Sequence, residues 1–148
     1  MKIRSINLPR VTQVKDDFLY FNVSLSSLEL PILTQAGSWF LYWNKSLTTL
    51  NLPKVTKVGD CFLYWNEVVT TLSLPKLTKV GDDFLYYNKS LTTLNLPKLT
   101  RRGGGFLYCN EVLTTLNLPK LTGTSSSFLW DNLRVKDILN ANQLNQPA

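Results

Sequence analysis

Acidic residues recur at a fixed spacing and are the side chains of this chain best suited to bind a metal ion. They are Asp16 and Asp17, Asp60, and Asp82 and Asp83. Carboxylate oxygens are ligands that Ca²⁺ and Mg²⁺ prefer, so stacked copies could hold a divalent cation. The intervening copy carries Ser38 and Trp39, however, which interrupts the acidic row. We therefore interpret the acids as solvated turn residues and predict no metal site.

Catalytic motifs are missing from the sequence. The chain of 148 residues contains no His, no Gly-x-Ser-x-Gly turn and no phosphate-binding Gly-x-x-x-x-Gly-Lys loop. Gly103-Gly104-Gly105 precedes Phe106 rather than a Lys, and Cys61 and Cys109 lack the spacing of metal ligands. The sequence predicts that the protein is not an enzyme and needs no cofactor.

Basic residues form two columns at the same spacing, in a chain whose net charge is +6. The columns are Lys54, Lys76, Lys98 and Lys120, and Lys57, Lys79 and Arg101. If neighbouring copies lie about 4.8 Å apart, two such charges repel by roughly 0.9 kcal/mol even in water. These columns could bind nucleic acid or another polyanion. We favour the alternative of a solubilising edge, balanced in part by Asp60 and Asp82.

All of these residues are positioned by a repeat of 22 residues. Proline marks its six copies at Pro9, Pro31, Pro53, Pro75, Pro97 and Pro119. A fixed period of about 20 to 50 residues is typical of stacked supersecondary units. Leu94 and Leu96 lie on one face of a strand that Pro97 ends, and Phe-Leu-Tyr-Tyr-Asn has the aromatic content of a second strand. The sequence predicts a mostly β, single-domain solenoid of six 22-residue coils over residues 1–132.

The repeat resembles a known family. Its motifs Leu-x-x-Leu-x-Leu-Pro, Leu-Thr-x-Val-Gly and Phe-Leu-Tyr-x-Asn resemble those of leucine-rich repeats, most closely the BspA-like bacterial class. Here Phe-Leu replaces that class's Ala-Phe, Asn replaces Cys, and the period is one residue shorter. The resemblance covers residues 3–132. It implies a leucine-rich-repeat fold and a role in protein recognition or adhesion, without naming the partner.

One asparagine occupies the same position in every copy, at Asn22, Asn44, Asn66, Asn88, Asn110 and Asn132. Stacking would align these amides in a ladder that satisfies backbone groups at a turn. Glycosylation is the alternative, since Asn22, Asn44 and Asn88 begin Asn-x-Ser sequences. The matching Asn66 and Asn110 keep the Asn without that sequence, so we favour the ladder.

Two surfaces are candidate partner-binding sites. The Leu-rich strands direct Thr49, Asn51, Thr71, Ser73, Thr93 and Asn95 outward, where leucine-rich repeats face a partner. A regular Thr-x-Asn array also resembles ice-binding solenoids, which is an alternative function. The second surface is an aromatic stripe of Phe21, Trp43, Trp65 and Tyr87. Either the Phe-Leu strand bends so that both residues enter the core, or a Leu-aromatic sheet is exposed.

These features predict a non-enzymatic interaction or assembly module that binds a protein, including another copy of itself. Unpaired edges of the first coil offer end-to-end stacking as a second route. The alternative is a truncated remnant of a larger repeat protein. Residues 133–148 are predicted to form a C-terminal cap or a decayed seventh coil, followed by a tail. The absence of a signal peptide, of a membrane span and of a Cys pair close enough for a disulfide favours the cytoplasm.

Overall fold

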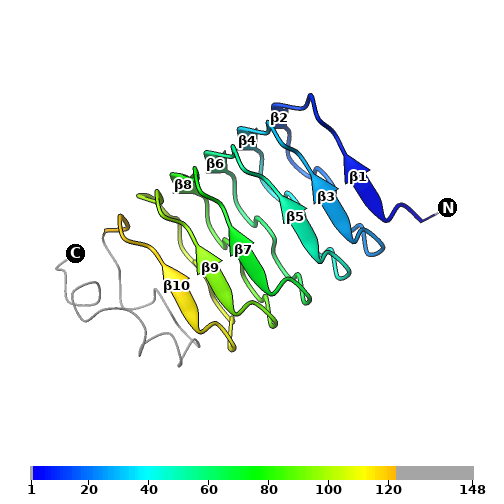
Figure 1. Cartoon of the computed structure of the whole chain (residues 1–148). Coiled ribbons are helices and arrows are strands. Elements are labelled where there is room, and N and C mark those ends of the chain that lie inside the picture. Colours follow the sequence, from blue (N-terminus) through cyan, green and yellow to red (C-terminus); the bar gives the residue numbers. More distant parts are fainter. Residues whose placement is uncertain (1, 123–148) are drawn as a thin grey trace.

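The computed structural model describes residues 2–122, which form a β-solenoid of about five turns with a spacing of about 22 residues (Figure 1). Its strands form three parallel sheets. The first contains β1 (Ser5–Asn7), β3 (Ser27–Glu29) and β5 (Thr49–Asn51), and the second contains β7 (Thr71–Ser73), β9 (Thr93–Asn95) and β10 (Thr115–Asn117). The third contains β2 (Gln13–Val14), β4 (Gln35–Ala36), β6 (Lys57–Val58) and β8 (Lys79–Val80). The predicted solenoid is confirmed over these residues.

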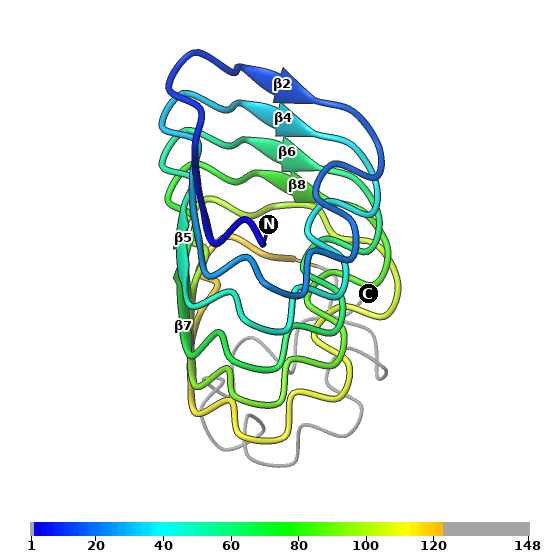
Figure 2. The same ribbon diagram turned by 90° about the vertical axis from the view of Figure 1, so that its right-hand side faces the viewer.

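Each coil has three sides around one apolar core. Figure 2 shows the β2–β8 sheet along one side, the Leu-rich strands along the next, and irregular turns along the third. The register pairs each residue with its equivalent 22 positions on, as in Leu28 with Leu50. Leucine and phenylalanine side chains fill the core, because the same position points inward in every coil. The predicted cap and tail lie outside the described residues.

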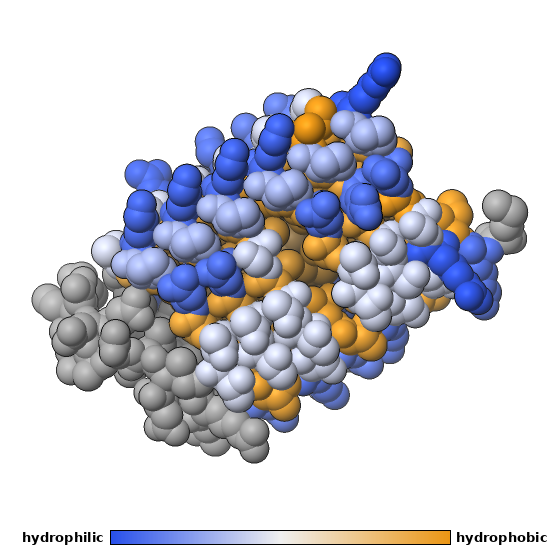
Figure 3. All heavy atoms as spheres, in the orientation of Figure 1, coloured by the Kyte–Doolittle hydropathy of each residue, from blue (hydrophilic) through white to orange (hydrophobic). Residues whose placement is uncertain are grey.

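The Leu-rich sheet is split between β5 and β7. In the described residues no ladder joins these strands, although β6 and β8 remain paired in register on the neighbouring side. The split coincides with Val69, which occupies a column where the other coils from the second to the sixth carry Leu. A turn bond joins each of those leucines to the preceding Asn carbonyl, as from Leu47 N to Asn44 O at 3.3 Å, but none is formed at Val69. Figure 3, drawn in the orientation of Figure 1, shows apolar surface between two pale patches, one over β3 and β5 and one over β7 and β9.

Restoring the repeat at this position is expected to close the split. Val68→Ser with Val69→Leu reproduces coil 2, where the Ser46 hydroxyl donates to Val23 O at 2.7 Å. The added buried methylene and the new ladder should raise the free energy of unfolding by about 1 kcal/mol. Urea unfolding and amide exchange at Thr71 and Ser73 measure both effects.

Val58→Leu provides the control, since Val58 is buried beside an intact ladder. There the extra methylene should overpack the core and destabilise the protein. Equal responses at the two sites would show that the split does not depend on Val69.

The third side is not the second strand that the sequence predicts. Residues 82–87 and their equivalents are turns in which every second residue is left-handed, as in Asp83, Leu85 and Tyr87 at φ of 53°, 56° and 61°. This alternation turns consecutive side chains such as Phe84 and Leu85 into the core together, where both are fully buried. The predicted bend at Phe-Leu is therefore the correct alternative, and a Leu-aromatic sheet is not exposed.

The left-handed residues are held by hydrogen bonds to neighbouring coils. Cys61 N donates to Asp82 O at 2.8 Å and Trp65 N to Tyr86 O at 2.8 Å, whereas Leu63 N reaches back to Phe40 O at 3.1 Å. A left-handed conformation costs an L-residue about 1–2 kcal/mol. The ladder bonds and the burial of the core side chains offset this cost.

One glycine column brings the coils into close contact just before these turns. A Cβ on Gly81 would lie 2.7 Å from both Asp60 N and Gly59 C, and the other glycines of the column are equally crowded by backbone. The position admits no side chain because the atoms in its way belong to the preceding coil. The glycine column is therefore a packing requirement of the stack.

Candidate functional site

Two rows of aromatic rings run side by side along the turn side of the solenoid. The inner row is Tyr20, Tyr42, Tyr64, Tyr86 and Tyr108, and its neighbouring rings stack at centroid distances of 4.6–5.1 Å. The outer row is the predicted stripe of Phe21, Trp43, Trp65 and Tyr87, spaced by 4.8–5.3 Å. Trp39 packs on Tyr42 at 5.2 Å. We call these ten residues the aromatic corner.

The rings are exposed most strongly at one end. The exposed fractions of Tyr20, Phe21 and Trp39 are 45%, 51% and 40%, whereas Trp43, Trp65 and Tyr87 are half-buried by their neighbours. Trp43 and Trp65 are nearly parallel, with an interplanar angle of 6°. The rings support one another from coil to coil, so the corner presents a rigid aromatic surface to solvent.

The predicted asparagine ladder fixes the backbone beneath this corner. Asn66 Nδ2 donates to Leu41 O of the preceding coil at 2.9 Å and to Tyr64 O at 3.1 Å, and Asn44, Asn88 and Asn110 repeat the pattern. These four side chains are fully buried. The ladder is thereby confirmed, and a buried Asn44 or Asn88 is not available to carry a glycan in the folded protein. Asn132 lies outside the described residues.

Charged side chains cover part of the outer row. Lys45 Nζ lies 5.0 Å from the Trp43 ring centroid and Lys89 Nζ lies 4.7 Å from that of Tyr87. Glu67 accepts a hydrogen bond from Trp65 Nε1 at 2.8 Å and approaches Lys45 to 3.8 Å. The sequence predicts an alternating column in which each Lys meets a Glu. Within residues 2–122 only this one pair forms, because Lys89 lies over a ring instead.

Carboxylates in the acidic turns accept hydrogen bonds from backbone amides of the next coil. Asp60 Oδ1 accepts from Asp82 N at 2.9 Å, and Asp82 Oδ1 accepts from Gly104 N at 2.7 Å. Burial, with Asp82 and Asp60 nearby, raises the pKa of Asp83. Among the described residues, no cluster of three or more His, Cys, Asp or Glu could hold a metal ion. These carboxylates act as acceptors that join coils.

The surroundings of Cys61 do not make it a nucleophile at neutral pH. Both Cys61 and Cys109 are free thiols, as predicted. Burial, together with Asp83, Asp60 and Asp82, raises the pKa of Cys61 to about 11. Burial likewise raises the pKa of Tyr64 to about 12, with Tyr86 and Asp83 as further causes. The Cys61 thiol and the Tyr64 phenol are therefore protonated and uncharged at neutral pH.

The second predicted surface lies on a different side of the solenoid. Thr49, Asn51, Thr71 and Ser73 are exposed on β5 and β7, and Thr93 and Asn95 are half-buried on β9. The structure therefore separates the predicted site residues into an aromatic set and a Thr/Asn set. The split between β5 and β7 also interrupts the regular Thr array on which the alternative of ice binding rests.

Sequence reasoning missed the inner tyrosine row and Trp39 as surface residues. The sequence predicts a strand at the tyrosines and a turn at Trp39, and the period of two in a strand places Tyr on the same face as Phe. The Tyr hydroxyl is the signal that could have identified the row, because a phenol keeps its polar end near solvent or a hydrogen-bond partner. The left-handed turn places them outside.

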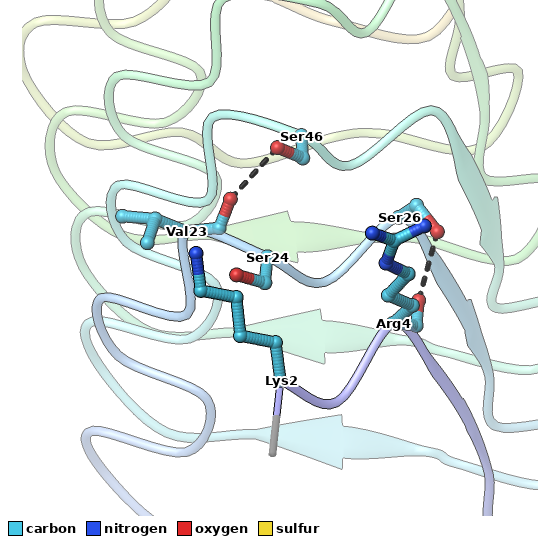
Figure 4. A pocket seen from close by; sticks show the side chains of 6 residues that line it. All are labelled: Lys2, Arg4, Val23, Ser24, Ser26 and Ser46. Atoms are coloured by element: carbon cyan, nitrogen blue, oxygen red, sulfur yellow. Dashed lines mark hydrogen bonds between the residues drawn. The ribbon is translucent and has the colours of Figure 1, made fainter.

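A shallow hollow of about 480 Å³ lies beside the first two coils (Figure 4). Lys2, Arg4, Val23, Ser24, Ser26 and Ser46 line it. The Ser26 hydroxyl donates to Arg4 O at 2.9 Å, and that of Ser46 donates to Val23 O. Two of its three serines are thus engaged with backbone oxygens.

This stack of short parallel strands around a leucine and phenylalanine core defines a leucine-rich-repeat β-solenoid. A family model described as a BspA type leucine rich repeat region of six copies matches residues 1–112 and 40–145. The chain belongs to this family, as its repeat motifs predict. Leucine-rich repeats commonly mediate protein interactions and are typically non-enzymatic. No curated protein and no solved structure matches the chain.

No helix within the described residues has the length and apolar character needed to cross a membrane.

Proposed function

We propose that this protein is a non-enzymatic interaction module that binds a protein partner through its aromatic corner. The observation that carries the proposal is the continuous row of rings from Phe21, which is exposed, to Tyr87, beside a second row of tyrosines. Tyr and Trp are enriched among the residues that dominate protein interfaces. Rings that are already held by stacking lose little conformational entropy when a partner covers them.

The Thr/Asn surface serves this function less well. Its exposed residues are small and polar, and the sheet beneath them is discontinuous at β5 and β7. The aromatic corner combines large apolar area with charged neighbours at Lys45, Glu67 and Lys89. An apolar centre with a polar rim is the arrangement found in protein interfaces.

Replacing two central rings tests the proposal. Trp43→Ser with Trp65→Ser should reduce partner capture from the native source by at least about tenfold, because truncation of a central aromatic residue costs about 2 kcal/mol or more. Thr49→Ser with Thr93→Ser is the matched control on the other surface and should leave capture unchanged.

Light scattering of the same variants tests a second copy as the partner. If the protein self-associates through the corner, the double Trp variant should be monomeric at concentrations where the parent is not. Capture that survives in the Trp variant and fails in the Thr variant would assign the interaction to the Leu-rich strands instead. Circular dichroism of each variant verifies the fold.

A further inference from the structure

A cationic strip runs along the β2–β8 side of the solenoid, away from the aromatic corner. It consists of Lys54, Lys57, Lys76, Lys79, Lys98 and Arg101, all of which are exposed. Register pairs Lys57 with Lys79, and a bridge joins Lys79 to Arg101. Figure 3 shows a row of hydrophilic side chains along the edge that this sheet shares with the Leu-rich strands.

The strip has no acidic partners in the part of the chain described. The one ion pair found there joins Lys45 to Glu67, which belong to another side. The nearest acids along the chain, Asp60 and Asp82, direct their carboxylates to amides of the next coil. Paired strands lie about 4.8 Å apart, so in-register cations repel one another in the free protein. A bound polyanion would relieve this repulsion.

We infer that this strip binds a linear sulfated polysaccharide. The strip is short, since its three coils span about 10 Å from the first coil to the last. It offers no helix or ribbon to enter a nucleic-acid groove. No aromatic residue lies in its two columns or at the intervening Val55 and Thr56, so it lacks the stacking platform typical of single-strand binding. None of the exposed large apolar side chains of the described residues belongs to the strip either, which disfavours a membrane surface.

The first two coils indicate which substitution to use in the test. The column of Lys57, Lys79 and Arg101 continues into Gln13 and Gln35 in the first two coils, where the sheet is intact. Lys57→Gln, Lys79→Gln and Arg101→Gln therefore introduce a side chain that this sheet already accepts. Lys2→Gln, Arg4→Gln and Lys15→Gln remove the same charge outside the strip and provide the control.

Affinity for a fluorescent heparin oligosaccharide, measured by anisotropy over a salt series, decides the question. The strip variant should bind at least about tenfold more weakly near 0.1 M salt, and its log–log salt slope should fall by about 2, as expected when three contacts are lost. The control variant should change affinity less than about threefold. An equal loss in both variants would overturn the proposal, as would tighter binding to single-stranded DNA of matched charge or to anionic vesicles. Thermal unfolding of the variants without heparin confirms that the fold is retained.

Discussion

Leu63→Ile is expected to lower the free energy of unfolding by about 2–3 kcal/mol, although it changes no side-chain volume. Leu63 is fully buried and adopts a φ of 51°. A β-branched side chain crowds its own backbone in this left-handed conformation, which such residues rarely adopt. Urea denaturation followed by circular dichroism measures the difference.

Leu77→Ile supplies the matched control. Leu77 is equally buried, and its φ is not among the positive values of the chain. There the same change of shape should cost less than about 1.5 kcal/mol. Equal losses at Leu63 and Leu77 would mean that the left-handed turn contributes nothing to the effect, which contradicts our description of the third side.

Asn66→Ala should destabilise the protein by about 1–3 kcal/mol. The substitution removes both hydrogen bonds from Asn66 Nδ2. Leu41 O loses this donor, whereas Tyr64 O still accepts from Trp43 N at 2.9 Å. Each buried acceptor that loses its partner costs about 1–3 kcal/mol. Chemical denaturation, with amide exchange near residues 63–66, gives the magnitude and the location of the loss.

The exposed member of the same column provides the comparison. Asn22 is exposed and donates to Tyr20 O at 3.0 Å within its own coil. Asn22→Ala should therefore cost only about 0.5 kcal/mol, because water can replace the lost bond. A similar cost at both positions would show that the ladder between coils does not stabilise the stack.

The repeat predicts most of the architecture. Because each coil solves the same packing problem, the inward positions of Leu94 and Leu96, the strand end at Pro97 and the ladder of Asn66 follow from the period and from side-chain polarity. The left-handed turns do not follow in this way. Aromatic residues favour strands, and only Gly105 at the position of Asp83 signals a positive φ. Another signal is the absence of Val, Ile and Thr from residues 83–87 and from their equivalents.

The split at β5 and β7 lies beyond sequence reasoning for a different reason. Val69 differs from Leu by one methylene, and the repeat motif tolerates either residue. Its effect depends on how the turn after Asn66 packs, which is a property of the assembled coils. The variation of the outer stripe between copies, from Phe21 to Trp43 to Tyr87, favours an exposed position, whereas the exposure of the tyrosine row follows only from the turn geometry.

The two proposed surfaces lie on separate sides of one rigid stack, so each can be tested without disturbing the other. The cationic strip belongs to the β2–β8 sheet, and the aromatic corner to the left-handed turns. The strip variant should keep partner binding, and the Trp variant should keep heparin binding.

Intrinsic fluorescence during a titration with the captured partner tests the central claim most directly. Of the four Trp residues, Trp39, Trp43 and Trp65 lie in the aromatic corner. If the partner covers this corner, Trp emission should shift saturably to shorter wavelength with the midpoint of binding, since the rings leave water. Replacing these three residues with Phe should remove the shift. Full binding with unchanged emission would contradict the claim and place the interface elsewhere on the solenoid.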